Sequence, residues 1–171
     1  MHNFSIRTDR LLLRPLSQDD ADAVFEWVSD ERVTKYMCYN TYHDIEQVKE
    51  WIASLENDTE YIFGYVRLSD GMLIGSGGIG PNHRGAGFWG FGYNLRYDCW
   101  GYGYATEAAK AMIEFAKNEF GAEKFICSHA EPNTASGNVM KKCGLHFSRY
   151  GEFCKLDGSC RMRSVIYEME L

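Results

Sequence analysis

Residues 93–107 read YNLRYDCWGYGYATE, a strand-like segment followed by a short glycine-containing loop and the start of a helix. The first N–H groups of a helix have no partner within the helix, and the helix dipole places partial positive charge at the same end. Gly101 and Gly103 carry no side chain that would keep an anion away from these N–H groups. The stretch therefore predicts a cradle for a phosphate or pyrophosphate group.

The spacing alone leaves the ligand open, because a Gly-x-Gly pair before a helix also occurs where glycine serves only a tight turn. A dinucleotide-binding fingerprint needs glycine or alanine where Thr106 stands, together with an early βαβ unit. A P-loop needs Gly-Lys followed by Ser or Thr. The sequence fits neither pattern. A nucleotide-binding domain that uses Gly101 and Gly103 for another phosphate is the alternative to test.

The segments on either side of this loop predict a strand before it and a helix after it. Aromatic and apolar side chains predict the strand at residues 88–95. Four alanines and Met112 share one face of a helix over residues 105–116, which Gly121 can end.

The rest of the chain shows strand and helix patterns in alternation. Apolar runs and β-branched or aromatic residues predict strands at residues 10–14, 61–68, 72–79, 125–129, 147–153 and 164–171. Helical spacing behind caps at Ser17, Thr41 and Asn133-Thr134 predicts helices at residues 21–28, 44–55 and 133–144. Turns are predicted at Asp70-Gly71, at residues 81–87 and at residues 156–158. The order of elements predicts an α/β fold with a mixed central sheet.

The composition predicts one cytosolic domain. With 171 residues, 45% of them apolar, the chain can bury one core, and the lack of a linker predicts a single domain over residues 1–171. No apolar run is long enough to span a bilayer, and the first residues lack the apolar segment of a secretory signal. We therefore expect a cytoplasmic protein with no membrane partner.

Charge and cysteine spacing limit the partners. The formal net charge of −6 argues against nucleic acid and mildly favours cationic partners, although an acidic surface serves solubility equally well. The six cysteines are scattered and form no CxxC pair, which predicts free thiols and no metal site: Cys38, Cys99, Cys127, Cys143, Cys154 and Cys160.

Residues 100–108, WGYGYATEA, resemble the acetyl-CoA loop of the GNAT superfamily of N-acetyltransferases, in the form found in its Rim-type branch. Further matches follow in family order at residues 10–15 (RLLLRP), 74–75 (IG), 92–93 (GY), 133–136 (NTAS) and 139–145 (VMKKCGL). Together they extend over nearly the whole chain. The resemblance implies the GNAT fold, an α/β fold whose central sheet is mixed, mostly antiparallel and flanked by about four helices.

The resemblance also implies acetyl-CoA as the cosubstrate and assigns residues to it. Backbone groups of Tyr93 and Leu95 would hold the acetyl group and the pantetheine. The pyrophosphate would be held by N–H groups of Trp100, Gly101, Tyr102, Gly103, Tyr104, Ala105 and Thr106. Asn133 and Ser136 would lie near the thioester. Lys142 would either reach the adenosine phosphates or be an ordinary solvated lysine.

Two positions depart from the family pattern and leave the acid and base open. Gly90 stands where many relatives have glutamate, and Met140 stands where a tyrosine general acid is usual. The remaining catalytic candidates are Ser136, which can protonate the thiolate or cap a helix, and His129, which is either a proton relay or structural. Glu107 is expected to be a structural acid in the first helical turn.

These features together predict an acetyl-CoA-dependent N-acetyltransferase acting on a primary amine by direct attack in a ternary complex. An α-amino group with a pKa near 8 is roughly 10% neutral at pH 7, whereas a lysine side chain near 10.4 is only about 0.04% neutral. A site without an obvious carboxylate base therefore favours a protein N-terminal α-amine or a small-molecule amine, or a base that works through water. The alternative is a catalytically silent acyl-CoA-binding or sensor protein. A homodimer is compatible both with the enzyme and with the silent binding protein.

Overall fold

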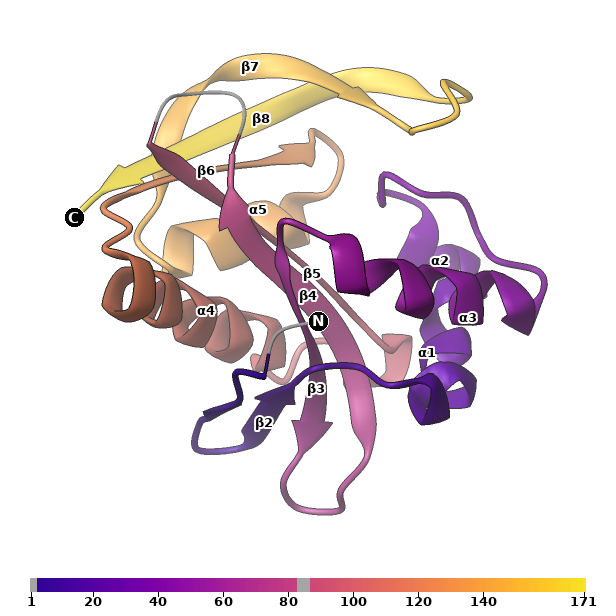
Figure 1. Ribbon diagram of the computed structural model, residues 1–171. Coiled ribbons are helices and arrows are strands. Elements are labelled where there is room, and N and C mark those ends of the chain that lie inside the picture. The colour runs from indigo at the N-terminus through magenta and orange to yellow at the C-terminus, as the bar shows by residue number, and fades with distance from the viewer. Residues whose placement is uncertain (1–2, 83–86) are drawn as a thin grey trace.

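The computed structural model describes residues 3–82 and 87–171 (Figure 1). Eight strands form one sheet in the order β1-β2-β3-β4-β5-β6-β8-β7. The strands are β1 Ile6–Arg7, β2 Leu11–Arg14, β3 Tyr61–Arg67, β4 Leu73–Pro81, β5 Phe88–Leu95, β6 Lys124–Ala130, β7 His146–Cys154 and β8 Arg161–Glu170. The α-helices are α1 Ala21–Val28, α2 Glu31–Thr34, α3 Ile45–Ser54, α4 Tyr104–Phe120 and α5 Thr134–Lys142, and 3-10 turns span Gln18–Asp20, Leu55–Asn57 and Tyr97–Cys99.

Helices cover both faces of this sheet, with α1 and α3 on one face and α4 and α5 on the other (Figure 1). Adjacent residues of β4 demonstrate the two layers, because side chains alternate across a strand. Ile74 packs in the same cluster as Met112 of α4, and Leu73 packs in the same cluster as Trp27 of α1. The sheet is thus the middle layer between two separate apolar cores.

The predicted fold class is confirmed: the sheet is mixed, and β5 with β6 is its one parallel pair among the described strands. Each predicted strand and helix coincides with an observed element to within a few residues. The described chain has five α-helices rather than about four, because α2 has four residues and is too short for a periodic pattern. The two-residue strand β1 was missed for the same reason.

The predicted cap of α3 is wrong, because Asp44 occupies that position rather than Thr41. The Asp44 carboxylate accepts a hydrogen bond from the Glu46 N–H at 3.0 Å, and the Gln47 side chain accepts one from the Asp44 N–H at 3.1 Å. Thr41 instead shares a 2.6 Å hydrogen bond with the hydroxyl of Thr34. The helix therefore begins three residues later than a cap at Thr41 implies.

The other predicted ends agree with the structure. Gly121 ends α4 in a left-handed conformation with φ of 66°, and the Asn133 side chain caps α5. The predicted turn at residues 81–87 includes residues 83–86, which lie outside the described part of the chain. None of the helices in residues 3–82 and 87–171 has the length and apolar character needed to cross a bilayer.

Candidate active site

The central feature of the site is a gap between β5 and β6. These two parallel strands pair only at their first residues, where Phe88 and Trp89 lie opposite Lys124 and Phe125. Beyond that point the strands diverge, and a cavity of about 1000 Å³ is lined by residues of both. Its lining also comes from the loop before α4, from α5, from the segment around α2 and from β7. A cavity of this size accommodates a drug-sized or cofactor-sized ligand.

The backbone of β5 faces this gap. The Phe91 N–H donates to the Cys127 sulfur at 3.3 Å, and the Cys127 thiol donates to the Phe91 carbonyl at 3.4 Å. Alternate residues of a strand direct their backbone groups to the same side, so Tyr93 and Leu95 direct theirs into the cavity as well. The Leu95 carbonyl, however, already accepts the Trp100 indole N–H at 3.0 Å. At Leu95 the carbonyl is therefore already engaged, and the N–H is the backbone group left to bind a ligand.

The loop between β5 and α4 has the conformation that its glycines suggest. Gly101 and Gly103 both have left-handed backbones, with φ of 83° and 85°, which only glycine adopts without strain. Gly103 is the residue before α4, so the first N–H groups of the helix lie next to it. The cavity lining includes six of the seven predicted positions, namely Trp100, Gly101, Gly103, Tyr104, Ala105 and Thr106. A helix start that borders a cavity is suited to bind an anion.

Tyr102 is the exception among these positions. Its side chain is 64% exposed, and the residue does not line the cavity. Its carbonyl accepts a hydrogen bond from the Arg10 guanidinium at 3.0 Å. Tyr102 thus anchors the back of the loop.

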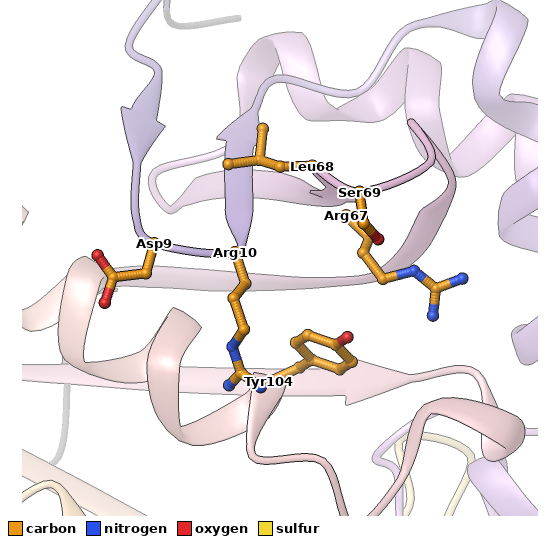
Figure 2. A pocket seen from close by; sticks show the side chains of 6 residues that line it. All are labelled: Asp9, Arg10, Arg67, Leu68, Ser69 and Tyr104. Carbon is orange, nitrogen blue, oxygen red and sulfur yellow. The ribbon is translucent and has the colours of Figure 1, made fainter.

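An ion pair between Arg10 and Glu107 supports the loop before α4. Figure 2 shows the Arg10 side chain reaching from the turn just before β2 toward the start of α4, where its guanidinium lies 4.6 Å from the centre of the Tyr104 ring. The Arg10 Nε donates to the Glu107 carboxylate at 2.7 Å, and the Thr8 hydroxyl donates to the same group, also at 2.7 Å. Burial acts to raise the pKa of Glu107, but these hydrogen bonds outweigh it and lower the pKa below its ordinary value. Glu107 is accordingly a charged structural acid, as the sequence indicates.

Arg10 and Tyr104 also border a second, smaller hollow of about 370 Å³ (Figure 2). Its other lining residues are Asp9, Arg67, Leu68 and Ser69. The two arginines there are already paired, Arg10 with Glu107 and Arg67 with Asp70. Both arginines that line this hollow are therefore already neutralised by carboxylates, and neither is left to bind an anionic ligand there.

Ser136 has a partner that the sequence does not reveal. Its hydroxyl lies 2.9 Å from the hydroxyl of Tyr93, which also lies 3.0 Å from the Ser136 carbonyl. Asn133 caps α5 by accepting the Ser136 N–H at 3.3 Å, so the Ser136 hydroxyl is not needed as a cap. Burial raises the pKa of Tyr93, so this phenol stays protonated at neutral pH. All three residues line the cavity.

His129 lies at the cavity wall but is held by packing. Its Nδ1 lies 2.8 Å from the Ala130 carbonyl, and its ring stacks on Tyr167. Its Nε2 is buried and has no hydrogen-bond partner among the described residues. A Cβ on Gly137 would lie only 2.6 Å from that nitrogen, so the ring is pressed against the backbone of α5. This environment fits a packing role better than a proton relay.

The charged side chains of the cavity are few, and they are Arg32, Lys35, Lys142 and Glu152. Lys142 ends α5 and is exposed. Glu152 on β7 is the single carboxylate among the described residues that line the cavity. Its side chain is 64% exposed and lies 3.5 Å from Arg161, a loose pair that leaves it available. Sequence reasoning missed Glu152 because no motif surrounds it in the terminal hairpin.

The two departures from the family pattern have different structural settings. A Cβ on Gly90 would lie 2.5 Å from the Asn82 side-chain nitrogen and 3.3 Å from the Ile126 carbonyl, so a glutamate here would require the Asn82 side chain to move. Met140 is buried and lines the cavity without offering a proton. Within residues 3–82 and 87–171 no disulfide forms, and no group of three acidic, histidine or cysteine side chains is arranged to hold a metal ion.

Comparison with known proteins fixes the family. A model of the acetyltransferase (GNAT) domain matches residues 10–146. The uncharacterized N-acetyltransferase p20 of Bacillus licheniformis is 28% identical over 152 residues, which are 86% of this chain and 84% of that protein. The chain therefore belongs to the GNAT family of acetyltransferases, whose members transfer acetyl groups from acetyl-CoA.

Solved structures show the same fold at low identity. A Vibrio cholerae protein assigned as a ribosomal-protein-serine acetyltransferase superposes with a TM-score of 0.81 at 17% identity, covering 98% of each chain. The microcin C7 self-immunity acetyltransferase MccE, in complex with acetyl-CoA and AMP, also gives 0.81 at 15% identity, covering 96% of this chain and 94% of that one. These likenesses confirm the fold of the chain.

Proposed function

We propose that this protein transfers the acetyl group of acetyl-CoA to a primary amine, either a protein N-terminal α-amine or a small-molecule amine, by direct attack in a ternary complex. The observation that carries the proposal is the single cavity that joins the helix start at Gly103, the hydroxyl of Ser136 and the carboxylate of Glu152. A phosphate site, a proton donor and a proton acceptor are what this reaction requires.

The bound cosubstrate would follow the open edge of β5. The N–H groups around Gly101 and Gly103 would hold the pyrophosphate, and the N–H of Leu95 with the backbone of Tyr93 would hold the pantetheine and the acetyl group. Asn133 would hold the start of α5 beside the thioester. The exposed Lys142, also at the cavity, would add a cation near the adenosine phosphates.

The proton transfers can be assigned within this cavity. A bond forms between the amine nitrogen and the thioester carbon, the C–S bond breaks, and the departing thiolate takes a proton from the Ser136 hydroxyl. Ser136 recovers its proton from solvent. Glu152 takes the first proton of the ammonium ion, directly or through water, before the neutral amine attacks, and the second proton of the attacking nitrogen leaves to solvent. Tyr93 holds the Ser136 hydroxyl in place, because its own raised pKa keeps it a neutral hydrogen-bonding partner.

Glu152 is the base in this scheme, and its replacement gives a pH-dependent result. In Glu152→Gln, kcat/KM for an α-amine is expected to be about tenfold lower at pH 7 and nearly parental at pH 9, because about 10% of such an amine is neutral at pH 7 and about 90% at pH 9. The measurement is a pH series of initial rates. Glu170→Gln is the matched control, since Glu170 is an exposed glutamate of β8 paired with Lys124 and does not line the cavity. A deficit that does not change with pH would remove the base assignment.

The proposed function itself is tested by thiol release. We expect acetyl-CoA with peptides bearing a free α-amine, or with small amines, to release CoA and give a product heavier by one acetyl group. A lysine peptide with a blocked N-terminus is the comparison. Calorimetry with CoA, NAD and ATP separates a CoA site from a nucleotide site. Tight CoA binding without thiol release on any amine would indicate a silent acyl-CoA-binding protein, and binding of ATP in preference to CoA would indicate a nucleotide site.

A further inference from the structure

Two segments far apart in sequence are tied together at one side of the cavity. The first is residues 34–40, which comprise the last residue of α2 and the segment after it. The second is residues 155–157, in the turn between β7 and β8; we call the pair the clasp (Figure 1). The Leu156 N–H donates to the Cys38 carbonyl at 2.8 Å, and the Asn40 side chain donates to the Asp157 carboxylate at 2.6 Å. The two segments lie more than a hundred residues apart along the chain, so only the fold brings them together.

Lys155 is the centre of the clasp. Its ammonium donates to the Tyr39 carbonyl at 2.9 Å and to the Thr34 carbonyl at 3.2 Å. Within the described residues Lys155 forms no ion pair with a carboxylate. The side chain is only partly exposed, unlike a solubilising surface lysine. Its two bonds to neutral carbonyls are charge-assisted, and such bonds are stronger than those between neutral groups.

The same segment is also tied to the sheet. The Tyr39 hydroxyl accepts a hydrogen bond from the Asn94 side chain at 3.2 Å, and the Ser76 hydroxyl donates to Asn94 at 3.0 Å. Asn94 is a residue of β5 and lines the cavity. Residues 34–40 are therefore fixed at one point to β5 and at another to Lys155, with cavity-lining residues between these ties.

These lining residues give the clasp a role. Tyr36, Met37 and Cys38 line the cavity, and so do Phe153 and Cys154, which directly precede Lys155. None of them belongs to the loop or helix start that would hold the cosubstrate. They are thus the part of the cavity left for the acceptor under the proposed function.

We propose that Lys155 is a positioning residue that sets the affinity for the acceptor amine by fixing residues 36–38 against the acceptor part of the cavity. The inference rests on the proposed function for what the acceptor is. Lys155 itself does not line the cavity. Its loss should loosen one wall of the acceptor site and leave the loop at Gly103 unchanged.

The test compares Lys155→Met, which keeps the length of the side chain, with Lys155→Arg, which can still donate to two carbonyls. In Lys155→Met we expect the acceptor KM to rise about tenfold, with kcat and the dissociation constant of CoA within about twofold of parental values. In Lys155→Arg the acceptor KM should return close to the parental value. Lys117→Met, on the exposed side of α4, is the matched control and should behave as the parent.

Hydrogen exchange of the protein alone gives a readout that needs no activity. Amides of residues 35–42 should exchange faster in Lys155→Met, whereas amides of α4 should not change. Unchanged exchange in residues 35–42, or an equal loss of acceptor and CoA affinity, would overturn the role of Lys155. A parental protein that acetylates no amine would instead overturn the proposed function, and with it the effect on KM, so the two failures are distinguishable.

Discussion

Replacing Ser136 by alanine is expected to lower kcat for acetyl transfer about a hundredfold, the scale of a lost general acid. The hydroxyl lines the cavity and lies 2.9 Å from that of Tyr93. Because a proton donor to sulfur is needed only as the thiolate forms, kcat and kcat/KM should fall together. The dissociation constant of CoA, measured by calorimetry, should stay within about twofold of the parental value, since a group used only in the transition state contributes little to binding.

Tyr93→Phe tests the other half of the pair. The ring remains, so the packing of β5 against α5 is kept, but the hydroxyl that holds Ser136 is lost. We expect a loss in kcat of about tenfold, smaller than for Ser136→Ala, because the serine proton is still present but less well oriented. The double variant should be no slower than Ser136→Ala alone if the two hydroxyls act as one unit.

A matched control separates chemistry from general damage. Ser54→Ala removes a hydroxyl that bonds the Trp51 carbonyl at 2.6 Å at the exposed end of α3, and it should leave kcat unchanged. Near-parental kcat in Ser136→Ala would contradict the assignment. Ser136 and Tyr93 would then have packing roles only, and positioning by the backbone would be the better account of the rate.

The strand, loop and helix around Gly101 and Gly103 could be predicted because the information is local. Two glycines before a helix predict a loop without bulky side chains, and both residues adopt left-handed backbones, with φ of 83° and 85°. The last two strands and the turn at residues 156–158 could likewise be predicted from local patterns of apolar, aromatic and turn residues. The local pattern failed at the start of α3, whose cap is Asp44, while the Thr41 hydroxyl is bonded to Thr34.

Contacts between distant segments could not be predicted from one sequence. Tyr93 and Ser136 lie 43 positions apart, and their hydroxyls meet only because β5 and α5 pack across the cavity. Glu152 and Lys155 have no motif around them, and their roles depend on where the terminal hairpin lies against residues 34–40. The position of His129 against Gly137 is likewise a result of packing.

A negative charge at position 103 is expected to weaken CoA binding about thirtyfold, or about 2 kcal/mol. Gly103 directly precedes α4, where the partial positive charge of the helix lies and where we place the pyrophosphate. A Cβ here would lie 3.5 Å from the Arg10 guanidinium, so the new side chain would point toward Arg10 more than into the cavity. The effect of Gly103→Asp should therefore come mainly from charge and from the strained backbone, with little from blocking.

Three variants separate these causes. Gly103→Asn has nearly the same shape as the aspartate without its charge, and asparagine tolerates a left-handed backbone, so it should lose only about threefold in affinity. Gly71→Asp introduces the same charge and strain at φ of 73° in the β3–β4 turn, where a Cβ meets nothing, and should bind CoA normally. The difference between Gly103→Asp and Gly103→Asn should shrink in 1 M salt, where the Debye length is about 3 Å. Equal CoA affinity in the parent and in Gly103→Asp at low salt would mean that the pyrophosphate binds elsewhere.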